Sequence, residues 1–331
     1  MNKAKVLFLL ILSFVSSFGV AQGVVEINNE TFPDSLFRDY LRKYYHANDI
    51  LTEDIIENVV DLSIRGVGIK SLKGIEYLTS LRNLDCGNTQ LTDLDVSKCT
   101  VLETLYCDGC NLKTLNISGA VVLKEVYCSL NQLTDLKVSG CDALGTLRCS
   151  YNQLVNLDVS ECSALRVLEC SGNQLDNLNV LQNVELIYLD CSYNKLSDLD
   201  VAGCPDLKSL YCHRNMIRGK SMDTFINSLP NSFPNSLLHI YNNNYGDEGN
   251  VCSKSQVAAA QTKGWIPEYY DDNAGTWREY EGSNDDELTD IILPSVQNAD
   301  INIYDLLGKR VNNLEGKKGI YIIGGKKVLK K

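Results

Sequence analysis

Cysteine is the residue type with the most chemistry to offer in this chain, because thirteen of its 331 residues are cysteines. Cysteines can form disulfides, bind metals or act as nucleophiles, so their spacing has to be considered first. One set recurs at a fixed interval of 21 residues: Cys86, Cys107, Cys128, Cys149, Cys170, Cys191 and Cys212. A second, less complete set with the same register comprises Cys99, Cys141, Cys162 and Cys204.

A cysteine that recurs once per repeat is expected to lie beside the cysteine of the next repeat. In-register side chains on neighbouring parallel strands are about 4.8 Å apart and point the same way. A disulfide instead needs converging Cβ atoms about 3.8 Å apart. Free cysteine behaves as a small buried apolar residue. We therefore predict a structural ladder of reduced thiols inside a narrow core.

Recognisable catalytic and metal-binding motifs are weak. Cys107 and Cys110 form one C-x-x-C motif, but no second pair accompanies it and Cys107 belongs to the ladder. The three histidines, His46, His213 and His239, lie in no nucleophile, paired-carboxylate or zinc-binding motif. The sequence therefore predicts a protein that is not an enzyme and that carries no cofactor or metal.

The ladder belongs to a repeat that fills the middle of the chain, residues 59–217, in about eight units. Each unit has two nested halves of 10 and 11 residues, with alternating apolar pairs such as Leu147/Cys149 and Leu157/Val159. A period of two is typical of strands with one buried face, and stacked units can bury what a single unit cannot. The opening leucines of successive units are Leu81, Leu102, Leu123, Leu144, Leu165, Leu186 and Leu207.

This repeat resembles the nested bacterial leucine-rich repeat often called the IRREKO type, and the array is similar to internalin-like surface proteins. The resemblance implies a β-rich leucine-rich-repeat solenoid, with parallel strands on both sides of each coil and little helix between them. It also implies that one asparagine per unit points inward and hydrogen-bonds the backbone of adjacent coils. The asparagines at that position are Asn131, Asn152, Asn173, Asn194 and Asn215.

The first 21 residues have the features of a secretory signal peptide. Lysines precede an apolar run that is too short to span a bilayer, and small residues follow at the expected cleavage site. We expect a mature protein that begins at Gln22 and has no transmembrane segment. The expected location is outside the cytoplasm, at the cell surface or in the extracellular space.

The segments on either side of the array are expected to cap its ends. Residues 22–58 predict a small helical cap, with a helix that starts behind Asp34 or Ser35. Residues 218–280 predict an α+β cap that covers the last coil. Residues 281–287 have the composition of a polar linker.

The tail, residues 288–331, is predicted to form a separate small unit of short β-strands. The strand from Ile303 to Leu306 and the segment Gly319-Ile-Tyr321, with a basic end, resemble the C-terminal sorting domain of the type IX secretion system. This resemblance implies recognition by secretion machinery. A relative that is not sorted, or a plain β appendix, is the alternative.

Charge is divided between the body and the tail. Residues 22–290 carry 21 lysines and arginines against 39 aspartates and glutamates, a balance of −18, whereas residues 291–331 carry eight against three. An acidic body disfavours nucleic acid and anionic membrane surfaces as partners. The basic tail is better interpreted as a recognition signal than as a nucleic-acid-binding arm.

The outward side chains of the first-half strands, with the residues that flank them, form the candidate binding face, because strand alternation places them opposite the ladder. Tyrosine and arginine, which are enriched at contact hot spots, are frequent there. The candidates are Tyr106, Tyr127, Arg148, Glu169, Tyr188, Asp190, Tyr211 and His213. Tyr151, Tyr193 and Arg214 flank them.

The predicted function is that of an adhesin-like protein that binds a protein ligand on a host or neighbouring cell, because solenoids use such extended faces for binding. A glycan-binding surface module that uses tyrosine platforms is one alternative. A structural component of the cell envelope is another, and it would need no exposed tyrosines.

Deleting residues 288–331 should leave the solenoid folded, because the stability of a repeat comes from its nearest neighbours. The truncated protein should no longer be displayed on the cell surface and should accumulate in the periplasm. Surface labelling of intact cells, with cell fractionation, measures both outcomes. Normal surface display of the truncated protein would reject the sorting role and favour a plain appendix.

Overall fold

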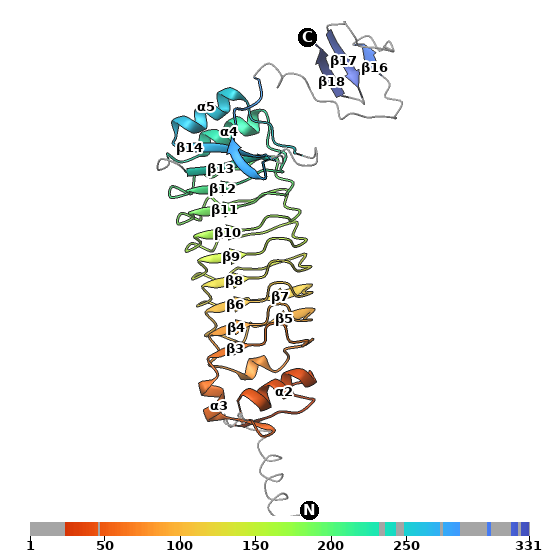
Figure 1. The fold of residues 1–331 in the computed structure, drawn as a ribbon, viewed down its shortest axis with the longest axis vertical. Helices are drawn as coiled ribbons and strands as arrows, with labels where there is room; N and C mark the ends of the chain where they lie inside the picture. Colours follow the sequence, from red (N-terminus) through yellow and green to blue (C-terminus); the bar gives the residue numbers. More distant parts are fainter. Residues whose placement is uncertain are drawn as a thin grey trace, which may run out of the picture.

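The protein is a β-solenoid with a helical segment at its N-terminal end and an α+β region at its C-terminal end, as the sequence predicts (Figure 1). The predicted signal peptide lies outside the described residues. The computed structural model describes residues 24–45, 47–231, 236–242, 248–271, 274–284, 303–305, 319–323 and 326–330.

One parallel sheet runs along the solenoid and contains one short strand from each coil (Figure 1). Neighbouring strands pair in register, so that Leu147 lies beside Leu168. In the central strands the middle residue is buried and the two flanking residues are half-buried on the outer side. The strands are β3 (Asp61–Ser63), β4 (Asn83–Asp85), β6 (Thr104–Tyr106), β8 (Glu125–Tyr127), β9 (Thr146–Arg148), β10 (Val167–Glu169), β11 (Tyr188–Asp190) and β12 (Ser209–Tyr211).

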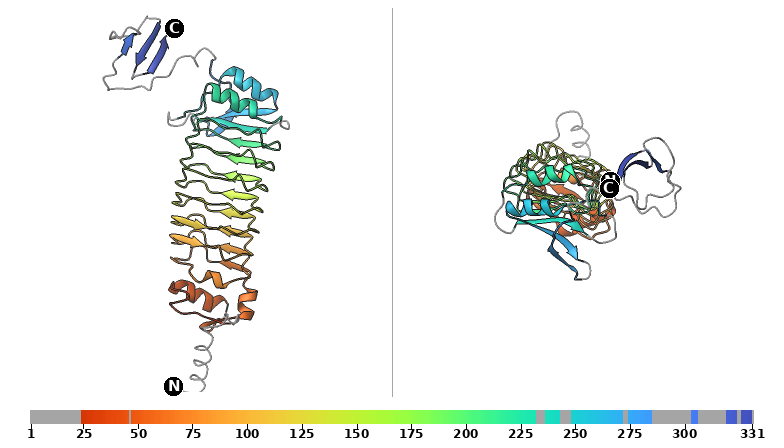
Figure 2. Two further views of the ribbon diagram at one scale, coloured as in Figure 1. Left: turned by 180° about the vertical axis from the view of Figure 1, so that it is seen from behind. Right: turned by 90° about the horizontal axis from the view of Figure 1, so that it is seen from above.

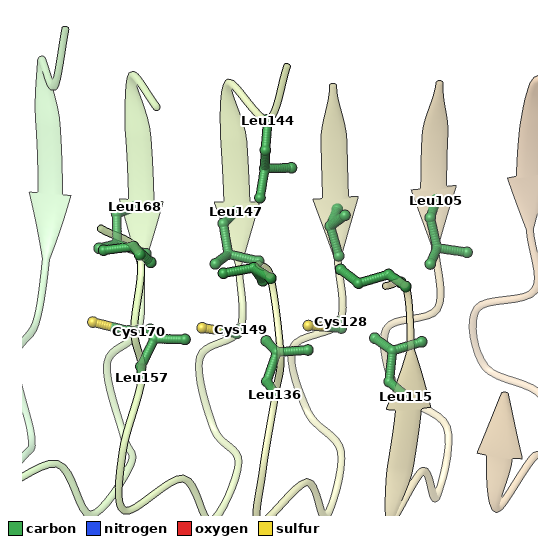
Figure 3. Close-up of a cluster of buried hydrophobic side chains, with 14 of the residues drawn as sticks. Leu105, Leu115, Cys128, Leu136, Leu144, Leu147, Cys149, Leu157, Leu168 and Cys170 are labelled. Carbon is green, nitrogen blue, oxygen red and sulfur yellow. The ribbon is translucent and has the colours of Figure 1, made fainter. Parts of the chain in front are cut away.

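Columns of leucine and cysteine side chains fill the interior of the coils. Figure 3 shows Cys149 and Cys170 of neighbouring coils pointing the same way, close to leucines such as Leu136 and Leu157. All thirteen cysteines are free and buried. Burial raises the pKa of the Cys128 thiol to about 12, which keeps it protonated and unreactive. The structure thus places the predicted ladder in the core as thiols.

The two cysteines of the C-x-x-C motif belong to two different columns of the repeat, the cysteine ladder and the asparagine column. Thr89 and Cys110 occupy the asparagine position in the first coils. The Thr89 hydroxyl donates to the carbonyl of Cys86 (2.7 Å), and Cys110 Sγ lies 3.2 Å from the same oxygen. Cys107 belongs to the ladder and is fully buried. Both cysteines of the motif therefore have structural positions.

On the opposite side of the coils, only some coils form a strand, whereas the sequence predicts strands on both sides of each coil. Two strands pair there, β5 (Asp93–Asp95) with β7 (Thr114–Asn116), and an isolated bridge joins Asn116 to Lys137. In the later coils this side has no strand: residues 157–159, 178–180 and 199–201 are assigned no regular structure. On this side, side chains therefore have to supply the hydrogen bonds between those coils.

The second cysteine set supplies part of that connection. Cys162 Sγ lies 3.7 Å from the carbonyl oxygen of Val138 in the preceding coil, within reach of a weak S–H hydrogen bond. Asn183 takes the place of a cysteine in this set, and its Nδ2 donates to Val159 O at 2.9 Å. The same contact to a preceding coil is made by Cys99, Cys141 and Cys204.

An inward-pointing asparagine connects each central coil to the coil before it. Asn152 Oδ1 accepts the backbone N–H of Leu133 (2.9 Å), and its Nδ2 donates to the carbonyls of Cys128 and Cys149 (both 3.0 Å). One side chain therefore satisfies three buried backbone groups of two coils. The same pattern recurs at Asn131, Asn173, Asn194 and Asn215.

The N-terminal segment covers the first edge of the main sheet. Asp34 caps the first long helix by accepting two backbone N–H groups of its first turn. The hydroxyls of Tyr40 and Tyr45 donate to the carbonyls of Ser63 (2.7 Å) and Asp61 (2.8 Å) on β3, so two edge acceptors are satisfied. The elements here are β1 (Val24–Glu26), α2 (Ser35–Tyr44), β2 (Ile50–Thr52), α3 (Glu53–Asn58) and η2 (Ile75–Tyr77).

The C-terminal region extends the main sheet before the chain leaves it. β13 and β14 add in parallel and β15 adds antiparallel, while α4 and α5 lie at the end of the stack (Figure 2). Asn250 continues the asparagine column, since its Oδ1 accepts from Ile217 N (2.9 Å) and its Nδ2 donates to Cys212 O (2.8 Å). The elements are α4 (Lys220–Ser228), β13 (Ser236–Asn242), α5 (Lys254–Thr262), β14 (Trp265–Asp271) and β15 (Thr276–Glu279).

Short strands also form in the tail. β16 (Ile303–Asp305), β17 (Gly319–Ile323) and β18 (Lys326–Lys330) make an antiparallel sheet in the order 16-17-18. None of the helices in the described ranges combines the length and the apolar character that crossing a bilayer requires.

Replacing Asn152 with alanine should lower the free energy of unfolding by about 1–3 kcal/mol, because the buried N–H of Leu133 loses its partner. The carbonyls of Cys128 and Cys149 each keep a second asparagine donor. Gln153→Ala is the matched control: its side chain is exposed, and its effect should stay within about 0.5 kcal/mol. Urea unfolding of both variants measures the difference. Equal stability of the two variants would mean that the asparagine column does not hold the coils together.

Candidate binding face

The structure aligns most of the predicted face residues in one column on the outer side of the main sheet. They are the third residues of successive strands and lie in register, one coil after another. Tyr188 belongs to the adjacent column, formed by the first residues of the strands. We call the column of third residues the outer column: Asp85, Tyr106, Tyr127, Arg148, Glu169, Asp190 and Tyr211.

The central part of the outer column is held by contacts between its own side chains. The rings of Tyr106 and Tyr127 stack with centroids 4.4 Å apart and planes at 17°. The Arg148 guanidinium lies 5.6 Å from the Tyr127 ring centroid, a cation–π contact, and its Nη1 is 3.0 Å from Glu169 Oε1. The Tyr127 hydroxyl donates to Glu125 (3.0 Å), and burial raises the pKa of Tyr127 to about 12. These side chains are therefore ordered while half-exposed.

An aromatic cluster closes the C-terminal end of the face. Tyr211 contacts both Tyr188 (5.3 Å between centroids) and His239 of β13 (4.1 Å). The ring of Trp277, on β15, stacks on His239 at 3.8 Å with an interplanar angle of 22°. Trp277 therefore folds back over the sheet and marks where the accessible face ends.

The exposure predicted for His213 is wrong. Its exposed fraction is 5%, because Trp277 of the hairpin β14–β15 covers it with a ring 5.0 Å away. The Tyr193 ring of the preceding coil lies 5.2 Å away on another side. Burial lowers the pKa of His213 to about 3. The repeat pattern could not show this, because the covering residue comes from outside the array.

His239 is a second buried histidine of the same cluster, and no motif around it predicts this position. Burial lowers the pKa of His239 to about 4 and raises the pKa of Glu268, whose Oε2 lies 2.6 Å from His239 Nε2. Both groups are therefore displaced toward their uncharged forms, and the contact has little ion-pair character. At neutral pH the cluster is uncharged at both histidines.

A second row of side chains borders the face where each strand ends. These residues come two positions after the ladder position, and all have positive φ, between 53° and 71°. This conformation suits glycine and asparagine but costs other residues about 1–2 kcal/mol each. We call it the turn row: Gly66, Asn88, Gly109, Leu130, Tyr151, Gly172, Tyr193 and Arg214.

Three bulky members of the turn row are exposed: Leu130 (60%), Tyr151 (56%) and Tyr193 (39%). Tyr151 lies against Gly172, where a Cβ atom would be 2.7 Å from the tyrosine ring. Tyr193 has the Arg214 guanidinium 5.0 Å from its ring. Leu130 was missed in the sequence, although glycines and an asparagine at the same register position signal the left-handed turn.

The described residues offer a surface for contact and little for chemistry. No group of three or more histidine, cysteine, aspartate or glutamate side chains in the described ranges is placed to hold a metal ion. The cysteine thiols are buried, and both described histidines have lowered pKa values. Aromatic and charged side chains in register are suited to recognition of a partner surface.

Solved structures of bacterial leucine-rich-repeat proteins are similar to this chain. A Leptospira interrogans leucine-rich-repeat protein matches with a TM-score of 0.50 and 25% identity over 56% of this chain and 50% of its own. A functional domain of InlJ from Listeria monocytogenes, said to include a cysteine ladder, is 25% identical over 66% of this chain and 57% of its own, with a TM-score of 0.40. Internalin C2 from Listeria monocytogenes is 24% identical over 62% and 94%, with a TM-score of 0.49.

The Leptospira match shows that the fold is a leucine-rich-repeat fold. The chain spans about half the length of the Leptospira and InlJ structures. No protein-family model and no curated protein sequence matches the chain.

Acidification from pH ~6.5 to ~4.5 should destabilise the C-terminal cluster. In the unfolded chain a histidine takes up a proton near pH 6.5, whereas folded His213 and His239 do so only near 3 and 4. Each histidine should therefore lower the free energy of unfolding by about 2 kcal/mol at pH ~4.5. Glu268, Asp190, Glu169 and Glu248 oppose this trend, because their raised pKa values stabilise the folded state as pH falls.

Urea unfolding at each pH measures the effect, with His239→Phe as the test variant. Phenylalanine keeps a ring against Trp277 but cannot titrate, so its stability should fall less steeply over this range. Identical pH profiles for the variant and the wild type would show that His239 does not bind protons differently in the two states.

Proposed function

We propose that this protein binds a protein partner through the outer column and the side chains beside it. The observation that carries the proposal is the ordered, half-exposed series Tyr106, Tyr127, Arg148 and Glu169, stacked in register on the main sheet. Tyrosine and arginine in pre-organised positions lose little entropy on binding and are frequent hot spots. The leucine-rich-repeat fold is consistent with protein–protein interaction and with no catalytic role.

The adhesin-like role at the cell surface is the more specific part of the proposal. It is supported by the signal-like residues 1–21 and by the sorting-like tail, whose described segments form the short antiparallel sheet β16–β18. The domain limits at residues 22, 59, 218, 281 and 288 belong to the same proposal. In this account the tail engages the secretion machinery, and the partner is a protein on a host or neighbouring cell.

Glycan binding is the second candidate function, and one observation favours it. Tyr151 lies on Gly172 with more than half of its side chain exposed, which is the arrangement that an aromatic platform for a sugar ring requires. A structural role in the envelope would need neither this platform nor the outer column.

The double variant Tyr127→Ala, Arg148→Ala should bind its partner at least ~30-fold more weakly, because truncating a central anchor costs about 2 kcal/mol or more. An array of purified cell-surface and secreted proteins, probed with the labelled full-length protein, identifies a partner. Surface plasmon resonance then measures how much affinity for that partner the variant loses. The matched control is Lys137→Ala with Asn177→Ala, two exposed residues on the opposite side of the coils.

The control should bind as the wild type does, and circular dichroism should show that both variants are folded. Equal binding by the Tyr127/Arg148 variant and the wild type would place the interface elsewhere. A signal on a glycan array with none on the protein array would instead support the second candidate.

A further inference from the structure

We propose that the exposed turn-row residues Leu130, Tyr151 and Tyr193 form a second anchor strip for the partner, and that the partner surface facing it is apolar and cationic. This inference rests on the proposed protein-binding function and adds to it a second contact line and the chemistry of the partner.

Backbone strain is the first argument for the strip. Half of the turn row consists of residues that tolerate positive φ, namely Gly66, Asn88, Gly109 and Gly172. The same turn therefore forms in this solenoid with residues that adopt positive φ at little cost. Leu130 and Tyr151 adopt the same strained conformation while leaving more than half of their side chains exposed. Backbone strain at side chains that stay largely exposed is typical of functional positions.

The second argument is that contacts hold these exposed side chains in fixed positions. The Tyr151 ring is supported from below by Gly172, which has no Cβ atom to displace it. Tyr193 is held between the Arg214 guanidinium (5.0 Å) and Asn242, whose Nδ2 donates to the tyrosine hydroxyl (3.2 Å). Rigid exposed tyrosines supply contact area at a low entropy cost, so these rings are already in a position to bind.

Charge gives the chemistry of the partner. On strands β8 to β11 beside the strip, Arg148 is paired with Glu169 (3.0 Å), and the other charged side chains are Glu125 and Asp190. The strip itself adds no charge. Residues 22–290 also carry a balance of −18, so the field of the body attracts cations. A partner surface with apolar side chains among lysines and arginines complements this face, whereas an acidic surface would be repelled.

A random-peptide phage library tests the strip, with the full-length protein as bait. Peptides enriched on the wild type should combine aromatic or aliphatic residues with lysine or arginine. The variant Leu130→Asn with Tyr151→Asn should bind those peptides at least tenfold more weakly. Its matched control is Leu181→Asn with Val184→Asn, which removes two exposed apolar side chains outside the strip (39% and 53% exposed) and should bind as the wild type does.

Thermal unfolding separates a binding role from a structural one. Asparagine relieves the strain at positive φ, so the Leu130/Tyr151 variant should melt at or above the wild-type temperature. A lower melting temperature would mean that the two side chains support the fold, and the strip would be rejected. Enrichment of acidic peptides would reject the cationic partner.

The two proposals fail in different ways. Peptides that lose binding to the Tyr127/Arg148 variant but keep it on the Leu130/Tyr151 variant would overturn the strip alone. Failure to enrich any peptide, together with glycan-array binding to the wild type, would overturn the protein-binding function and the strip together. Failure to enrich any peptide with no glycan signal would also count against both.

Discussion

The structure depends on one constraint: each coil must satisfy its buried backbone groups on the coils beside it. The main sheet does this on one side through in-register pairing. At the turn after each strand, the asparagine column satisfies these groups. Asn152, for example, hydrogen-bonds backbone groups of two coils. On the far side, thiols and Asn183 reach the preceding coil. A fixed 21-residue spacing is the sequence consequence, because any slip would break all three connections together.

The same constraint leaves the outer side chains free to vary from coil to coil. Inward positions repeat as leucine, cysteine and asparagine, while the outer column varies among tyrosine, arginine and acidic residues along the sheet. The turn row shows the difference most clearly, because its backbone conformation is constant and its side chains range from Gly109 to Tyr151. The fold supplies a rigid frame, and in the proposed function the side chains that this frame leaves unconstrained determine what is bound.

Much of this could be predicted from the sequence, because periodicity reports what is repeated. The period predicts the solenoid, the ladder and the side chains that share the outer column. It does not predict contacts made by residues outside the repeat. Asn250 continues the asparagine column from a segment without the repeat, and Trp277 buries His213 from a hairpin beyond the array. The glycines and the asparagine at the register position of Leu130 indicate a left-handed turn, but only the folded turn shows that its side chain is exposed.

Hydrogen exchange of the full-length protein, resolved to single amides, tests the central claim about the asparagine column most directly. In five successive coils one backbone N–H is bonded to an asparagine Oδ1: those of Leu112, Leu133, Leu154, Leu175 and Leu196. These amides should exchange as slowly as the amides of the main sheet, because they open only when coils separate. Exchange as fast as that of exposed turn amides would contradict the account.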